Sequence, residues 1–151
     1  MLYPILKWIH ILAAIIALGA NLTYPLWMTL AQKRPESLVF TLKTVKLMDD
    51  RMANPPYVLA LLTGIGMVHA AGIPYTTPWI AAALILYAVV SVLGLGAYSP
   101  LLKKQIALAE SPGPDSADYK AIALRGNILG GAISLMVIAI TFLMTVKPQL
   151  W

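Results

Sequence analysis

The chain has 151 residues, of which 60% are hydrophobic and 11% are charged, and it contains no cysteine. The absence of cysteine excludes disulfides, thiolate metal sites and covalent haem attachment through a Cys-x-x-Cys-His motif. All 17 formal charges, 11 basic and 6 acidic, lie in residues 1–7, 33–51, 103–125 and 147–151, which leaves charge-free runs at residues 8–32, 52–102 and 126–146. A soluble domain of this length has no core large enough to bury those runs, so the composition excludes a soluble protein.

The charge-free runs predict four transmembrane helices. A bilayer core about 30 Å thick takes roughly 20 apolar helical residues to cross, so the first and third runs each provide one span. The middle run holds two spans, because Gly72, Pro74 and Pro78 interrupt it. The predicted fold is all-α: a transmembrane four-helix bundle, one domain over residues 1–151, with helices at about residues 2–30, 55–71, 78–102 and 117–146.

The first predicted helix, residues 2–30, contains Pro25, which is expected to kink it. Residues 37–52 then carry apolar side chains at helical spacing, namely Leu38, Leu42, Val45, Met48 and Met52. This pattern predicts a short amphipathic helix on the cytoplasmic membrane surface, between the first and second spans. We expect Asn54-Pro55-Pro56 to stop this helix and to open the second span.

The third predicted helix begins at Pro78 and ends near residue 102, where Pro100 bends the chain into a polar connection. Residues 111–115, Ser-Pro-Gly-Pro-Asp, predict a loop, and Asp115 or Ser116 is placed to cap the fourth helix. The fourth helix is expected to end before Lys147-Pro148.

The basic residues predict the orientation in the membrane. Nine of the 11 lie in the two long connections, at residues 33–51 and 103–125, and only Lys7 and Lys147 lie on the other side. By the positive-inside rule both connections are cytoplasmic, and both termini face outward across a bacterial inner membrane. The net charge of +5 is then a topology signal and predicts no nucleic-acid partner. A cleaved signal peptide ending near residues 17–19 is the alternative for the first run, but the run continues to residue 30, which favours a span.

Each predicted span carries a stripe of small or polar residues, which in lipid mark the faces where helices meet. The stripes are His10, Ala14, Ala17 and Asn21; Val58, Leu62, Gly66 and His69; Tyr87, Ser91, Gly94 and Tyr98; and Asn127, Gly131, Ser134, Thr141 and Thr145. These faces either pack one bundle or dock a membrane-protein partner or a second copy of the chain.

The predicted spans contain no aspartate or glutamate, which argues against carboxylate proton relays, acidic cation sites and hydrolytic triads. Two histidines remain, His10 and His69, both in the outer half of the predicted bundle. An imidazole can ligate haem iron, and copper or zinc is a weaker alternative because no carboxylate or thiolate supports it. In the simplest structural alternative, His10 hydrogen-bonds across the bundle and His69 reaches headgroup water.

The sequence also resembles a known family. Residues 6–19, LKWIHILAAIIALG, followed by Tyr24-Pro25, resemble the opening of the DUF2269 family of small predicted integral membrane proteins. Residues 62–66, LTGIG, and residues 143–148, LMTVKP, also fit this family. The chain is more distantly similar to CopD-like and HemJ-like four-helix membrane proteins, and the HemJ-like resemblance implies b-type haem and porphyrinogen oxidation. Only His10 carries over, since Met28 and Thr29 stand where a HemJ-like chain would show another histidine.

The leading hypothesis is a multi-pass membrane protein that binds b-type haem near its outer face, through His10 and with His69 as a second candidate ligand, for electron transfer or redox sensing. The alternative is a cofactor-free accessory subunit of a larger membrane complex. A third possibility, permeation of a metal or small molecule, has less support because the spans lack acidic residues.

Overall fold

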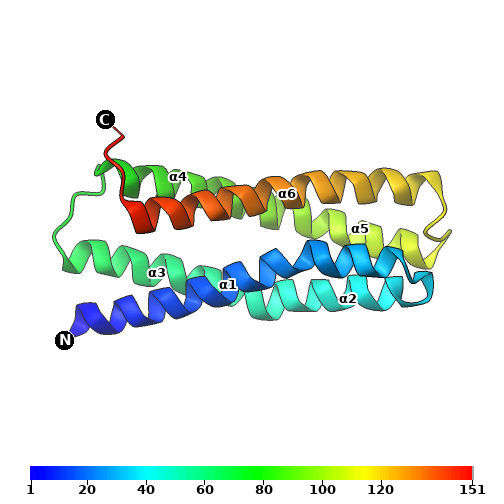
Figure 1. The fold of residues 1–151 in the computed structure, drawn as a ribbon, viewed down its shortest axis with the longest axis horizontal. Coiled ribbons are helices and arrows are strands. Elements are labelled where there is room, and N and C mark those ends of the chain that lie inside the picture. Colours follow the sequence, from blue (N-terminus) through cyan, green and yellow to red (C-terminus); the bar gives the residue numbers. More distant parts are fainter. Residues whose placement is uncertain (151) are drawn as a thin grey trace.

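The computed structural model describes residues 1–150, and every regular element in this part of the chain is helical (Figure 1). The first helix, α1 (Leu2–Gln32), is joined by a short 3-10 turn (Pro35–Ser37) to α2 (Leu38–Met48). The other helices are α3 (Asn54–Ala70), α4 (Pro78–Leu93), α5 (Ser99–Glu110) and α6 (Ala117–Val146). Two π-helical turns, Asp49–Ala53 and Gly94–Tyr98, join α2 to α3 and α4 to α5.

The helices form four long antiparallel rods (Figure 1). One rod is α1, the second runs from α2 into α3, the third from α4 into α5, and the fourth is α6. The backbone stays helical where the π-helical turns meet their neighbours, so α2 and α5 extend the rods of α3 and α4. Both termini lie at one end of the rods, and the α1–α2 and α5–α6 connections lie at the other.

Each π-helical turn ends two residues before a proline, which explains two differences from the sequence expectation. A proline within an α-helix lacks the N–H for the usual hydrogen bond, and its ring collides with the carbonyl four residues earlier. The wider π turn accommodates both the missing N–H and the proline ring, ahead of Pro55 and Pro56 and again ahead of Pro100. The structure therefore does not stop the helix at Asn54-Pro55-Pro56, and the helix from Pro78 continues past residue 102 to Glu110.

The apolar face of α2 packs into the bundle, where α2 contacts α1 and α5. Leu42 and Val45 are fully buried and Leu38 nearly so, as their spacing predicts. Beyond Val45, however, the buried positions are Asp49 and Ala53, whereas Met52 is 50% exposed. The face expected to be wholly apolar thus ends in a carboxylate.

Two further contacts order the end of the rods that carries α2 and α5. Lys43 on α2 pairs with Glu110 on α5, with 2.6 Å between Nζ and Oε1. Both side chains are about half exposed, so this ion pair contributes little stability. Ser116 caps α6, because its hydroxyl oxygen accepts a hydrogen bond from the Tyr119 N–H at 3.2 Å; this is one of the two capping residues expected from the sequence.

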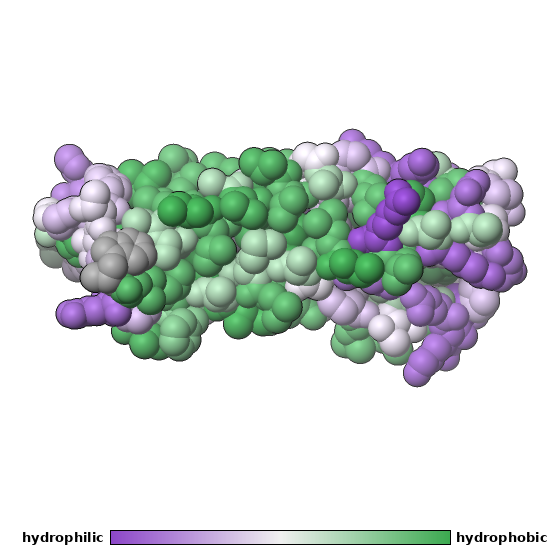
Figure 2. Space-filling view, turned by 90° about the horizontal axis from the view of Figure 1, so that it is seen from above, coloured by the Kyte–Doolittle hydropathy of each residue, from purple (hydrophilic) through white to green (hydrophobic). Residues whose placement is uncertain are grey.

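Within residues 1–150, three helices are long and apolar enough to cross a membrane: Leu2–Gln32, Pro78–Glu110 and Ala117–Val146. The shorter α3, which carries Asn54, two prolines and His69, is not among them. A belt of hydrophobic side chains covers much of the length of the molecule in Figure 2, and hydrophilic residues gather at both ends, most extensively at the end formed by α2 and α5. This surface is that of a protein surrounded by lipid.

Candidate functional site

A cavity of about 620 Å³, here called the outer cavity, lies toward the end of the bundle that holds the termini. It opens between two helix pairs, since α1 packs chiefly against α3 and α4 chiefly against α6. Its volume falls within the range of about 300–1,000 Å³ typical of ligand sites. Most of its wall is apolar, and among the described residues its charged lining consists of Lys7 and Lys147, with no acidic side chain.

His10 lies in the wall of the outer cavity and is held by the backbone of α3. Its Nδ1 lies 2.8 Å from the Ala60 carbonyl oxygen, and a carbonyl can only accept, so Nδ1 carries the proton. The Thr63 hydroxyl, 3.3 Å from the same nitrogen, donates to the Leu59 carbonyl oxygen and so accepts from His10. In the neutral ring Nε2 therefore keeps its lone pair, the arrangement found in metal-ligating histidines.

The glycines of α3 let α1 approach closely at this level. A Cβ on Gly64 would lie 3.1 Å from His10 Cε1, and a Cβ on Gly66 would lie 3.3 Å from Leu6 Cδ1. Two of the stretches that carry the family resemblance, residues 6–19 and 62–66, thus contact each other. Small residues on α3 create the space that His10 occupies.

His69 is placed differently from His10. It lies near the end of α3, is exposed, and does not line the outer cavity. Leu62, on the same predicted stripe, is 61% exposed, so the face of α3 that meets α1 is the one carrying Thr63 and Gly64. The structure therefore does not bring the two histidines to one cavity. Within residues 1–150, no group of three or more His, Cys, Asp or Glu side chains is arranged to hold a metal ion.

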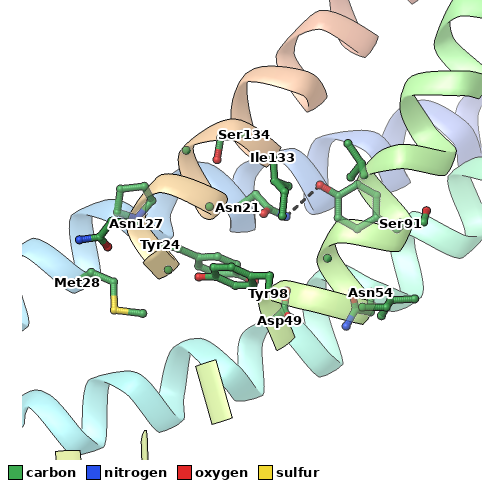
Figure 3. A pocket seen from close by; sticks show the side chains of 18 of the residues that line it. Asn21, Tyr24, Met28, Asp49, Asn54, Ser91, Tyr98, Asn127, Ile133 and Ser134 are labelled. Carbon is green, nitrogen blue, oxygen red and sulfur yellow. Dashed lines mark hydrogen bonds between the residues drawn. The ribbon is translucent and has the colours of Figure 1, made fainter. Parts of the chain in front are cut away.

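A second cavity of about 410 Å³, here called the inner cavity, lies farther toward the α2 and α5 end (Figure 3). Nine of the predicted stripe residues line it: Asn21, Val58, Tyr87, Ser91, Gly94, Tyr98, Asn127, Gly131 and Ser134. Five others, His10, Ala14, Ala17, Thr141 and Thr145, line the outer cavity, and Gly66 packs on Leu6. Most of the small and polar stripes thus face cavities between the helices.

Asp49 supplies the charge of the inner cavity. It begins the first π-helical turn, is 9% exposed, and lies close to Tyr98 in Figure 3. Burial raises the pKa of this carboxyl, as does the neighbouring Asp50, while the Lys46 ammonium and the Asn54 amide act in the opposite direction. Among the described residues that line this cavity there is no lysine, arginine or histidine. The two cavities therefore carry charges of opposite sign.

Sequence reasoning missed Asp49 because it looked for carboxylates only within the spans. A signal was nevertheless present: Leu38, Leu42, Val45 and Asp49 follow one another at spacings of four, three and four residues. This is the period of one helix face, and all four side chains are buried. A charged residue in register with a buried apolar face indicates that the carboxylate points inward.

Two tyrosines separate the cavities and belong to the walls of both. The rings of Tyr57 on α3 and Tyr87 on α4 meet edge to face, with centroids 6.5 Å apart. Tyr87 donates its hydroxyl to the Tyr57 carbonyl oxygen at 2.9 Å, and Asn21 on α1 donates its side-chain N–H to the Tyr57 hydroxyl at 3.0 Å. These bonds tie three rods together at one level, so a small polar network divides the interior of the bundle.

Comparison with known proteins adds the family. The family model described as "Predicted integral membrane protein (DUF2269)" matches residues 4–148, which confirms the resemblance seen in the sequence. Neither the curated proteins nor the solved structures give a match.

Proposed function

Because the chain belongs to the DUF2269 family of predicted integral membrane proteins, we propose that it works within a lipid bilayer and holds b-type haem in its outer cavity, with His10 as the axial ligand. One observation carries the proposal: the bond from His10 Nδ1 to the Ala60 carbonyl oxygen, at 2.8 Å, which leaves Nε2 as the ligating nitrogen on a cavity wall. A histidine that served only to join α1 to α3 would have no need of a cavity beside it.

The remaining wall of the outer cavity suits a flat apolar group that carries acidic substituents. Small residues, Ala14, Ala17 and Gly64, leave space beside His10, and the rest of the lining is chiefly apolar. Lys7 and Lys147, the two basic residues of the lining, provide partners for the two propionate groups of a haem. Lys147 also lies over the ring of Trp79, 5.3 Å from its centroid.

Only one histidine takes part in this proposal. His69 is exposed and does not line the cavity, so a ligand set of both histidines has no support from the geometry. If haem were held there by His10, it would supply one-electron redox chemistry. The chain itself positions the imidazole through Ala60, excludes water with its apolar wall, and presents its lysines to the acidic groups, an arrangement that suits electron transfer or redox sensing.

We also infer that all four rods cross the bilayer, and that the chain lies in a bacterial inner membrane with both termini outside. The rod of α2 and α3 is antiparallel to α1 in Figure 1, and it ends beside the termini. The connections rich in lysine and arginine lie at the opposite end. The positive-inside rule assigns that end to the cytoplasm, which puts the outer cavity near the external face.

The absorption spectrum tests the haem proposal. The full chain is purified in mild detergent from a haem-replete host, beside His10→Ala and the matched control His69→Ala. We expect a Soret band in the natural protein and in His69→Ala, and its loss in His10→Ala, because only His10 lies on the cavity wall.

Two outcomes would overturn this proposal. If the natural protein shows no Soret band, the haem proposal is wrong, and copurification with a stoichiometric membrane protein would favour the accessory-subunit alternative. A band that persists in His10→Ala but disappears in His69→Ala would show that the wrong histidine has been assigned.

A further inference from the structure

We propose that the inner cavity is a separate binding site for a small organic ammonium ion, held by the Asp49 carboxylate within a group of tyrosine rings. This site is distinct from the outer cavity and does not depend on whether haem is bound there. Four observations favour this ligand class: the charge of the lining, its aromatic residues, an unpartnered hydroxyl, and the backbone of the two π-helical turns.

The charge of the lining selects a cation. Asp49 is the only residue carrying a formal charge at neutral pH among the described residues of the inner cavity. It forms no salt bridge within residues 1–150, since Lys46 pairs with Asp50 instead. A buried carboxylate without an ion-pair partner is costly unless a cation accompanies it.

The aromatic lining favours an organic cation over an alkali-metal ion. Four tyrosines line the inner cavity: Tyr24, Tyr57, Tyr87 and Tyr98. Three of them, Tyr24, Tyr57 and Tyr98, come from three different rods: they lie on α1, on α3 and in the second π-helical turn. Aromatic faces attract ammonium groups, and aromatic cages are the usual receptors of methylated amines. The volume of about 410 Å³ would leave a bare metal ion far from most of the wall.

Tyr24 provides the second, independent observation. Its side chain is 4% exposed, and its hydroxyl oxygen is buried with no hydrogen-bond partner among the described residues. Tyr24 lies next to Tyr98 in Figure 3, on the side of the cavity that contains Asp49. A buried polar atom left without a partner costs stability. An N–H or hydroxyl donor of a bound ligand would complete its hydrogen bonding.

The backbone supports the same location. The first π-helical turn carries Asp49 and the second carries Tyr98, so both local distortions of the rods line one cavity. Such turns are frequent at functional sites. Pro25 on α1, also in the lining, lacks an N–H and so leaves the Asn21 carbonyl without its usual helical donor.

Calorimetric titration of the full chain in detergent tests the proposal with a matched pair of probes. Choline carries a quaternary ammonium, and 3,3-dimethyl-1-butanol has nearly the same shape without the charge. We expect choline to bind saturably and the neutral alcohol to bind about tenfold more weakly or not at all, because it gains neither cation–π attraction nor a carboxylate partner.

Variants then identify the carboxylate. We expect Asp49→Asn to weaken choline binding by about tenfold or more, because the substitution removes the carboxylate that accompanies the ammonium charge. Glu36→Gln, which neutralises an exposed carboxylate at the same end of the rods, is the matched control and should bind choline as the natural chain does.

Each result of the titration either supports or overturns the proposed ammonium site in the inner cavity. Equal binding of choline and the alcohol, absence of choline binding, or unchanged binding in Asp49→Asn would each overturn the proposal. Displacement of choline by an equal concentration of sodium or potassium chloride would overturn the assignment to organic cations. If Asp49→Asn does not fold, the comparison of choline, the alcohol and the two salts on the natural chain is sufficient.

Discussion

At the scale of single residues, the two side chains that define the cavities are held in opposite ways. His10 is fixed by a hydrogen bond to a backbone carbonyl and by the close approach of Gly64. Asp49 is buried by the helix face to which it belongs, at a cost to its charged form. The first arrangement stabilises the fold and prepares a ligand. The second destabilises the fold, which is a common property of functional residues.

Gly64→Ala tests how tightly His10 is held. The new Cβ would lie 3.1 Å from His10 Cε1, so the imidazole must move away from the Ala60 carbonyl. We expect a loss of about 1–3 kcal/mol in stability from the overpacking, and with it weaker haem retention. Gly19→Ala is the control, because no atom lies within 4 Å of its added Cβ and it gains up to about 1 kcal/mol in helix propensity. Thermal unfolding in detergent should separate the two variants, and equal stabilities would show that Gly64 is not needed for space.

The pH dependence of unfolding tests the burial of Asp49. The pKa of Asp49 in the folded protein is raised above the ordinary value of 3.8. Its carboxyl therefore leaves the free energy of unfolding unchanged below that pH, and lowers it as the pH rises through the raised pKa. The titratable groups around it come from its own run and from three other segments: Lys46, Asp50, Tyr24, Tyr57 and Tyr98. Asn cannot ionise, so Asp49→Asn should unfold at a higher temperature than the natural chain at about pH 8, and the difference should shrink toward about pH 4. A difference that stays constant with pH would contradict the raised pKa.

At the scale of elements, hydropathy and periodicity were sufficient to predict the helices but not how they join. The buried face of α2 through Leu38, Leu42 and Val45 was visible as a helical repeat. The continuation of the rods through Pro55 and Pro100 was not, because a proline in a sequence indicates a break and nothing in it reports a π-helical turn that removes the clash.

The same reasoning explains which part of the candidate site could be predicted. His10 was found because an ionisable residue inside an apolar run is conspicuous. Asp49 was overlooked because it lies among charged residues in a connection, where carboxylates are usually solvated. The four tyrosines that line the inner cavity come from three rods, so their common location depends on tertiary packing that no single stretch of sequence records.

A pair of leucine variants tests the packing of α2. Leu42 is fully buried and Leu47 is 58% exposed, although both lie on the same short helix. We expect Leu42→Ala to cost about 2–5 kcal/mol, as cavity-creating substitutions do, and Leu47→Ala to change stability by less than about 0.5 kcal/mol. Denaturant-induced unfolding in detergent measures both. Similar small effects would mean that α2 lies on the membrane surface and not in the bundle.

At the scale of the whole molecule, the rods are longer than a bilayer core requires. Thirty residues of α6 span about 45 Å at 1.5 Å per residue, against a core of about 30 Å. The excess lies at the end formed by α2 and α5, where the hydrophilic surface is most extensive (Figure 2). The inner cavity is therefore the one nearer to this polar end, and the outer cavity the one nearer to the termini.

That arrangement requires a definite orientation, which the absence of cysteine makes simple to measure. Thr76→Cys introduces a thiol in the exposed α3–α4 connection, and Glu36→Cys introduces one in the exposed α1–α2 connection. If the basic connections are cytoplasmic, a membrane-impermeant maleimide should label Thr76→Cys in intact cells and Glu36→Cys only after permeabilisation. Each variant serves as the control for the other, because every labelled thiol is the introduced one. The reverse pattern would place the outer cavity on the cytoplasmic side, and labelling of both in intact cells would mean that the rod of α2 and α3 does not cross the bilayer.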